Sequence, residues 1–129
     1  MTLSNADVTE MHQLYAAYCL AVDDGDGKAF SSCFTEDGSV DTGGPSISGT
    51  DQLESFAEGV PASVPGIRHV VSNVHVVGDG DDAQGRAYVI AYSAAGGKAS
   101  LLITGRYRDS LRRVDGTWLF AKRHFTPDS

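Results

Sequence analysis

The second half of the chain constrains the fold most, because it contains four long strand patterns joined by short turns. Three turn sequences separate these patterns: GDGD, AAGGK and VDGT. The last contains the Asp-Gly pair that is favoured in tight hairpins. Hairpin-linked strands in succession predict an antiparallel meander, with strands near residues 68–77, 83–94, 98–113 and 117–125.

The N-terminal part carries helical signals instead. Ser4 and Asp7 form a capping-box pattern, and the apolar residues behind them recur at helical spacing, which predicts a helix over residues 5–23. Gly25 is expected to end this helix in a left-handed conformation, and Asp26 to cap a short second helix.

Two short strands and a third helix are expected between these helices and the meander. FTEDGSV and SISG are typical of brief strands interrupted by GGP, Thr50 is expected to cap the third helix, and Pro61 and Pro65 to close it. Helices followed by a run of hairpin-linked strands predict an α+β fold with the helices on one face of a curved, mainly antiparallel sheet. A single domain spanning residues 1–129 is expected, with a hollow between the first helix and the strands that face it.

Composition restricts the classes of partner. The net charge of -7 and the pI near 4.8 disfavour nucleic acid and anionic membranes, which require a basic surface. No apolar run approaches the roughly 20 residues that span a bilayer, and the N-terminus lacks the pattern of a signal peptide, so a cytoplasmic location is expected. Cys19 and Cys33 lie in apolar helical patterns and are interpreted as reduced core residues.

The segment GIRHVVSNVHVV, residues 66–77, combines a valine-rich strand with large polar side chains. Alternation places His69, Asn73 and His75 on one face together with two valines. A polar-lined cavity would suit this mixture. For Asn73 a structural role at a β-bulge is an equal alternative, and His75 is expected at the rim of the cavity or outside it.

Other motifs do not indicate a metal or a cofactor. GDGDD lacks the ligand spacing of a calcium loop, and no glycine-rich phosphate loop joins a strand to a helix. The run Arg106, Arg108, Arg112 places three arginines on one strand face, with Arg113 on the other, which favours a solvated or subunit-facing surface.

The order of elements resembles the SnoaL-like branch of the nuclear-transport-factor-2-like superfamily over nearly the whole chain. The stretches YAAYCLAVDDGD, AFSSCFTEDGSV, GIRHVVSN and GRYRDSLRRVDGTWLFAKR carry this resemblance. It implies a cone-shaped, barrel-like fold. It implies no single reaction, since the scaffold serves dehydratases, isomerases, polyketide cyclases and noncatalytic domains.

The resemblance to the dehydratase and dehydrochlorinase members implies two catalytic residues. Asp23, at the end of the first helix, matches the carboxylate that holds a histidine, and His69, at the start of the first long strand, matches the general base. A carboxylate that accepts the Nδ1 proton fixes the tautomer and leaves Nε2 as the base. The alternatives are a solvated acidic cluster for Asp23 and a histidine bonded to a backbone carbonyl for His69.

The remaining candidate site residues are aromatic or amide side chains expected near the hollow. They are Tyr18, Phe34, Phe56, Asn73, Tyr88, Tyr92 and Trp118. The tyrosine hydroxyls are candidates to polarise a carbonyl or a leaving group, and Trp118 is equally a core residue.

These observations predict a cofactor-independent lyase or isomerase, dehydratase-like, acting on a small, apolar, cyclic metabolite. A polyketide-type aldol cyclase uses the same acid and base chemistry. The alternative from another class is a noncatalytic ligand-binding or accessory subunit domain. A homodimer is expected, with the arginine-bearing outer face of the sheet as its contact.

Overall fold

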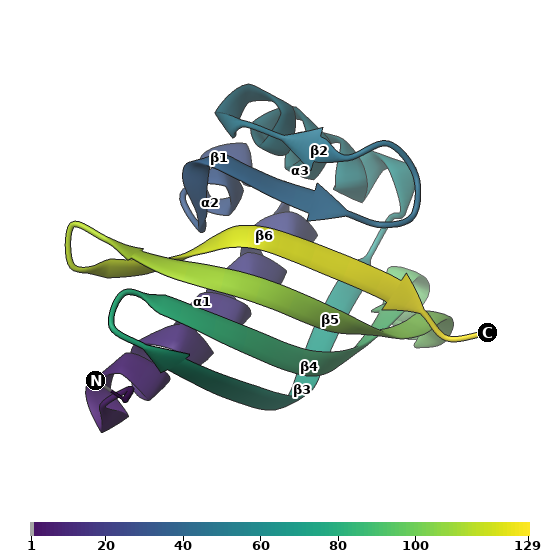
Figure 1. The fold of residues 1–129 in the computed structure, drawn as a ribbon. Coiled ribbons are helices and arrows are strands. Elements are labelled where there is room, and N and C mark those ends of the chain that lie inside the picture. The colour runs from purple at the N-terminus through teal and green to yellow at the C-terminus, as the bar shows by residue number, and fades with distance from the viewer. Residues whose placement is uncertain (1) are drawn as a thin grey trace.

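The computed structural model describes residues 2–129, which form three α-helices and one six-stranded sheet (Figure 1). The sheet order is β2-β1-β6-β5-β4-β3, so β2 and β3 are its two edges and the sheet stays open. The helices are α1 (Asn5–Asp24), α2 (Gly27–Ser31) and α3 (Thr50–Ser63). The strands are β1 (Phe34–Asp41), β2 (Ile47–Ser48), β3 (Ile67–Asp79), β4 (Asp82–Ser93), β5 (Ser100–Val114) and β6 (Thr117–Pro127).

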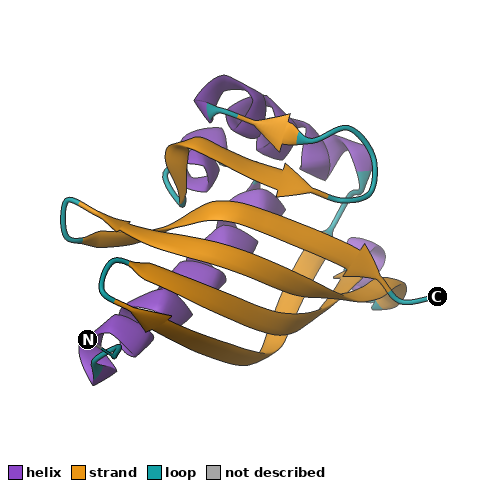
Figure 2. Ribbon diagram, viewed as in Figure 1, coloured by secondary structure: helices purple, strands orange, loops and turns teal. Residues whose placement is uncertain are grey.

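The α+β fold class is confirmed, with α1 lying across one face of the curved sheet (Figure 2). Strands β3 to β6 form the predicted antiparallel meander. Asp115 and Gly116, in the β5–β6 turn, both have positive φ, as a two-residue type I′ hairpin requires. A short 3-10 turn, Ala95–Gly97, connects β4 to β5.

Local signals set the ends of α1 as predicted. The Ser4 hydroxyl accepts from the Asp7 backbone N–H, and the Asp7 carboxylate accepts from the Ser4 N–H, which completes the capping box. Gly25 has φ 67° and ends the helix in the left-handed region. The Asp26 carboxylate accepts from the Ala29 N–H and caps α2.

The sheet is mainly antiparallel, as predicted, and its parallel pair, β1 with β6, adds the β1–β2 hairpin to the meander. Two expectations for the middle of the chain are corrected. The N-cap of α3 is Gly49 rather than Thr50, and no side chain caps it. The helix also continues through Pro61 to Ser63, because a proline in the last turn removes only one hydrogen bond shortly before the helix ends.

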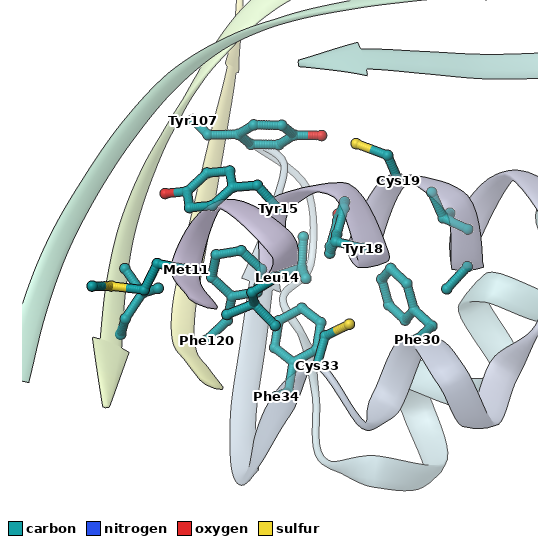
Figure 3. Packing of buried hydrophobic residues seen from close by; sticks show 14 of the residues in the cluster. Met11, Leu14, Tyr15, Tyr18, Cys19, Phe30, Cys33, Phe34, Tyr107 and Phe120 are labelled. Carbon is teal, nitrogen blue, oxygen red and sulfur yellow. The ribbon is translucent and has the colours of Figure 1, made fainter. Parts of the chain in front are cut away.

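The core lies between α1 and the concave face of the sheet (Figure 3). Tyr18 of α1 is at its centre, with its ring 4.9 Å from the Phe30 ring and 5.8 Å from the Phe120 ring, measured between centroids. Cys19 and Cys33 are both free and buried in this cluster, as predicted.

Candidate active site

An aspartate and a histidine that are 46 residues apart in the sequence meet where the end of α1 crosses β3. Asp23 Oδ1 lies 2.6 Å from His69 Nδ1. The Asp23 carboxylate also accepts from the His69 backbone N–H, at 3.0 Å to Oδ2 and 3.2 Å to Oδ1. Because β3 is an edge strand, this N–H has no neighbouring strand to bond, and Asp23 satisfies it. The side chains are 17% and 7% exposed for His69 and Asp23.

His69 borders a cavity of about 250 Å³ between α1, α3 and the concave face of the sheet. The walls are mainly apolar, and they include Val22, Val40, Phe56, Val60, Val89, Ile103 and Phe125. The hydroxyl-bearing residues are Tyr18, Thr42, Ser63 and Tyr107. An apolar enclosure with a few polar groups is typical of a small-molecule site.

Two of the seven aromatic and amide residues expected near the hollow line this cavity. Tyr18 contributes from α1 and Phe56 from α3. Tyr107 of β5 is among the wall residues that sequence reasoning missed. Its signal was present in the alternation of GRYRDSL, which places Tyr107 on the apolar face together with Leu111.

Four of the other predicted residues lie elsewhere. Phe34 and Trp118 are packed in the core, and the Trp118 indole N–H donates to Asp7. Tyr88 is 56% exposed on the opposite, convex face of the sheet, because it alternates with the buried Ala87 and Val89. Tyr92 is half-buried near the end of β4 and does not line the cavity.

A β-bulge corrects the expected common face of His69, Asn73 and His75. In β3, Ser72 pairs with Tyr88 and His75 with Arg86, so Asn73 and Val74 together face one residue of β4. Asn73 has φ 56°, and alternation shifts by one residue after it. Val74 and Val76 therefore pack on the core, while Asn73 and His75 are exposed. This geometry agrees with the alternative prediction for Asn73, a structural role at a β-bulge.

A buried ion pair lies in the core beside the cavity. The Arg123 guanidinium donates to Asp109 at 3.0 Å and 3.3 Å, and neither side chain is exposed. The guanidinium also lies 3.4 Å from the centre of the Tyr107 ring and 4.3 Å from that of Tyr18. Burial works most strongly against the charge of Arg123, but the Asp109 carboxylate and the neighbouring tyrosines together outweigh it, so the pKa of Arg123 is raised. Both phenols of the cavity wall therefore lie against a permanent cation.

The two cavity phenols remain protonated at neutral pH. Burial raises the pKa of Tyr107 to about 12, and it raises the pKa of Tyr18 well above its ordinary value. Both hydroxyls can therefore donate a hydrogen bond to a bound molecule. The cavity therefore has the His69 imidazole on one element and neutral hydroxyl donors on two others.

Two further properties concern the described residues as a whole. Within residues 2–129, no group of three or more His, Cys, Asp or Glu side chains is arranged to hold a metal ion. None of the helices in this range is long and apolar enough to cross a membrane.

The chain matches the SnoaL-like domain family over residues 4–124 and belongs to this family. No match was found among the curated proteins.

Several solved structures are similar to this chain. A protein of unknown function from Mycobacterium tuberculosis, Rv3472, is 32% identical, with a TM-score of 0.88 over 95% of this chain and 72% of that one. A cystatin-like protein of unknown function from Nostoc punctiforme is 22% identical, with a TM-score of 0.91 over 99% and 96%. A candidate scytalone dehydratase from Novosphingobium aromaticivorans is 21% identical, with a TM-score of 0.82 over 96% and 85%. The last two likenesses concern the fold alone.

Proposed function

We propose that the protein is a cofactor-independent lyase or isomerase of the dehydratase type, with His69 as general base and Asp23 as its positioning partner. The observation that carries the proposal is the 2.6 Å contact between His69 Nδ1 and Asp23 Oδ1 at the wall of a largely apolar cavity. The family and its dehydratase-like neighbours support an enzyme fold of this general type.

The proposed base is the second ring nitrogen of His69. With Nδ1 committed to Asp23, the proton of a neutral imidazole sits on Nδ1 and the lone pair on Nε2. No described residue in 2–129 makes a hydrogen bond to Nε2. That nitrogen is therefore available to a molecule in the cavity, and Asp23 stabilises the imidazolium that forms when it accepts a proton.

The proposed reaction removes a proton from a carbon next to a carbonyl. The C–H electron pair forms a carbon–carbon double bond, a hydroxyl on the neighbouring carbon leaves, and the imidazolium returns its proton to give water. If no hydroxyl is present, return of the proton to another carbon moves the double bond. The Tyr18 and Tyr107 hydroxyls lie on the cavity wall as donors for the carbonyl or the departing oxygen.

The cavity also supports a substrate class. A volume of about 250 Å³ is small for a ligand site, and its walls are largely apolar. These properties favour a compact, mainly apolar molecule with one or two oxygen functions, such as a cyclic β-hydroxy ketone.

A panel of cyclic β-hydroxy ketones, followed by proton NMR in D₂O, tests the proposal. Elimination, or deuterium uptake at the carbon beside the carbonyl, is expected with the wild type and is expected to fall by about 10²–10⁴-fold in His69→Gln. His12→Gln is the matched control, because His12 is exposed on α1. Equal rates in the wild type and His69→Gln would contradict the proposal, as would binding without any exchange or elimination, which would favour the noncatalytic alternative.

A further inference from the structure

Four basic side chains form a row across the convex face of the sheet, the face opposite the cavity. His75 of β3 pairs directly with Arg86 of β4, Arg86 with Arg108 of β5, and Arg108 with His124 of β6. Directly opposed residues of antiparallel strands point to the same side of the sheet. Arg86 and Arg108 are exposed and alternate with buried residues, so the row lies on the convex face.

The centre of this row is unfavourable in the isolated chain, because Arg86 and Arg108 are two directly opposed cations. Like charges directly opposite each other destabilise a sheet. The chain has seventeen acidic residues, yet none of those described in residues 2–129 forms an ion pair or hydrogen bond with Arg86 or Arg108. Two other arginines of the meander differ, since Arg113 pairs with Asp7 and Asp81, and Arg123 pairs with Asp109.

Within residues 2–129, an acidic side chain contacts the row itself only at its His124 end. His124 lies 3.2 Å from Asp41. Arg106 lies two residues before Arg108 in β5, outside the row. Its guanidinium is 4.0 Å from the Asp128 carboxylate, and both side chains are about half exposed. The centre of the row therefore keeps its positive charge in a protein whose net charge is -7.

The row borders a hollow of about 250 Å³ on this face. Its walls include Asn73, His75, Arg86, Tyr88, Arg106 and Arg108. Asn73 is the bulge residue with φ 56°, a conformation that is strained for a residue other than glycine. The bulge turns the Asn73 amide and the His75 ring toward this face instead of the core.

We propose that this hollow binds the phosphate group of a small phosphate ester. Three guanidinium groups suit a dianion rather than a single carboxylate, because phosphate offers a second negative charge and a third acceptor oxygen to their forked donors. The Asn73 amide is a further donor, and the Tyr88 ring beside Arg106 offers an aromatic surface to the organic part of the ester. A bound phosphate would screen the repulsion between the arginines and so remove its destabilising effect on the sheet.

Thermal unfolding with inorganic phosphate, and with sodium chloride at matched ionic strength, tests the site. Phosphate is expected to raise the wild-type Tm by several degrees more than chloride. Arg86→Gln and Arg108→Gln should remove this difference and should each raise the Tm without phosphate, because they relieve like-charge repulsion. Arg112→Gln is the matched control, since Arg112 is exposed on the same face of β5, opposite Asp82, and does not line the hollow.

Two comparisons separate the possible occupants. Phenyl phosphate should bind several-fold more tightly than inorganic phosphate if the ligand is an ester, and His69→Gln should keep the full phosphate response, since the cavity is a separate site. Equal effects of phosphate and chloride on the wild type would overturn the proposal. A phosphate-insensitive dimer that dissociates in Arg86→Gln, seen by sedimentation, would also overturn it and assign the row to a contact with acidic residues of a second copy.

Discussion

Asp109 of β5 and Arg123 of β6 are directly opposed on the concave face of the sheet and form an ion pair with no exposed surface. The Tyr15 hydroxyl donates to the same carboxylate. One guanidinium nitrogen of Arg123, Nη1, is buried without a hydrogen-bond partner among residues 2–129. The aromatic rings of Tyr15, Tyr18, Tyr107 and Phe120 surround the cation.

Removing one partner of this pair should be costly. Arg123→Met leaves the Asp109 carboxylate buried without its cation and is expected to lower the free energy of unfolding by about 3–5 kcal/mol. Chemical denaturation of the two proteins measures this difference. The exposed neighbour supplies a control, since Lys122→Met should change stability by less than about 0.5 kcal/mol. A double variant, Arg123→Met with Asp109→Leu, should recover part of the loss, and no recovery would contradict the account of the pair.

Asp7 should make stability depend on pH in the acid range. Its hydrogen bonds to the Ser4 N–H and the Trp118 indole, together with nearby Arg113, lower its pKa to about 2. A carboxyl whose folded-state pKa is lowered contributes stability above its unfolded value, near 3.8, and loses it as the pH falls through about 2. Asp7→Asn should therefore be less stable than the wild type at pH 7, with a gap that narrows below pH 4. Urea midpoints across this range measure the gap, and a constant gap would contradict this assignment.

The two cysteines should be unreactive in the folded protein. Burial raises the pKa of both the Cys19 and the Cys33 thiol to about 11, from an ordinary value of 9.0. The thiolate fraction at pH 8 is then lowered by roughly 100-fold, and burial adds a steric barrier. Labelling with a chromogenic disulfide reagent should be at least about 100-fold slower in buffer than in urea. Fast labelling of the native protein would show that one of these thiols is accessible.

The Tyr107 hydroxyl should contribute to turnover if the proposed function holds. Tyr107→Phe keeps the ring beside Arg123 and removes one donor from the cavity wall. The loss of one such donor is expected to lower kcat by about 10²–10³-fold. Tyr92→Phe removes a hydroxyl outside the cavity and serves as control. Equal effects of the two substitutions would show that the Tyr107 hydroxyl does not contact the reacting molecule.

Local chemistry explains which parts of the fold were predictable. The capping box at Ser4, the left-handed Gly25 and the Asp-Gly hairpin each depend on a few adjacent residues, so the sequence predicts them directly. The parallel pairing of β1 with β6 joins segments about 80 residues apart, and no local pattern encodes it. The bulge at Asn73 is likewise fixed by the register against β4, and it reverses which side chains of β3 face the core.

The candidate site likewise contains residues that the sequence identifies and residues that it does not. Asp23 and His69 were found by resemblance to a family, because their contact depends on α1 crossing β3. Arg123 was missed because it stands beside Lys122 and reads as a surface charge. A signal for the buried pair was nevertheless present, since Asp109 alternates with Tyr107 and Leu111 on an apolar face and so requires a buried partner.

The tautomer of His69, measured by long-range proton–nitrogen NMR, tests the central claim most directly. In the wild type the proton is expected on Nδ1, held by Asp23, with Nε2 unprotonated. In Asp23→Asn the amide oxygen should keep the bond from the His69 N–H and the amide nitrogen should donate to Nδ1, which moves the ring proton to Nε2. A wild-type ring protonated on Nε2, or the same tautomer in both proteins, would contradict the assignment of Asp23 and His69 as a working pair.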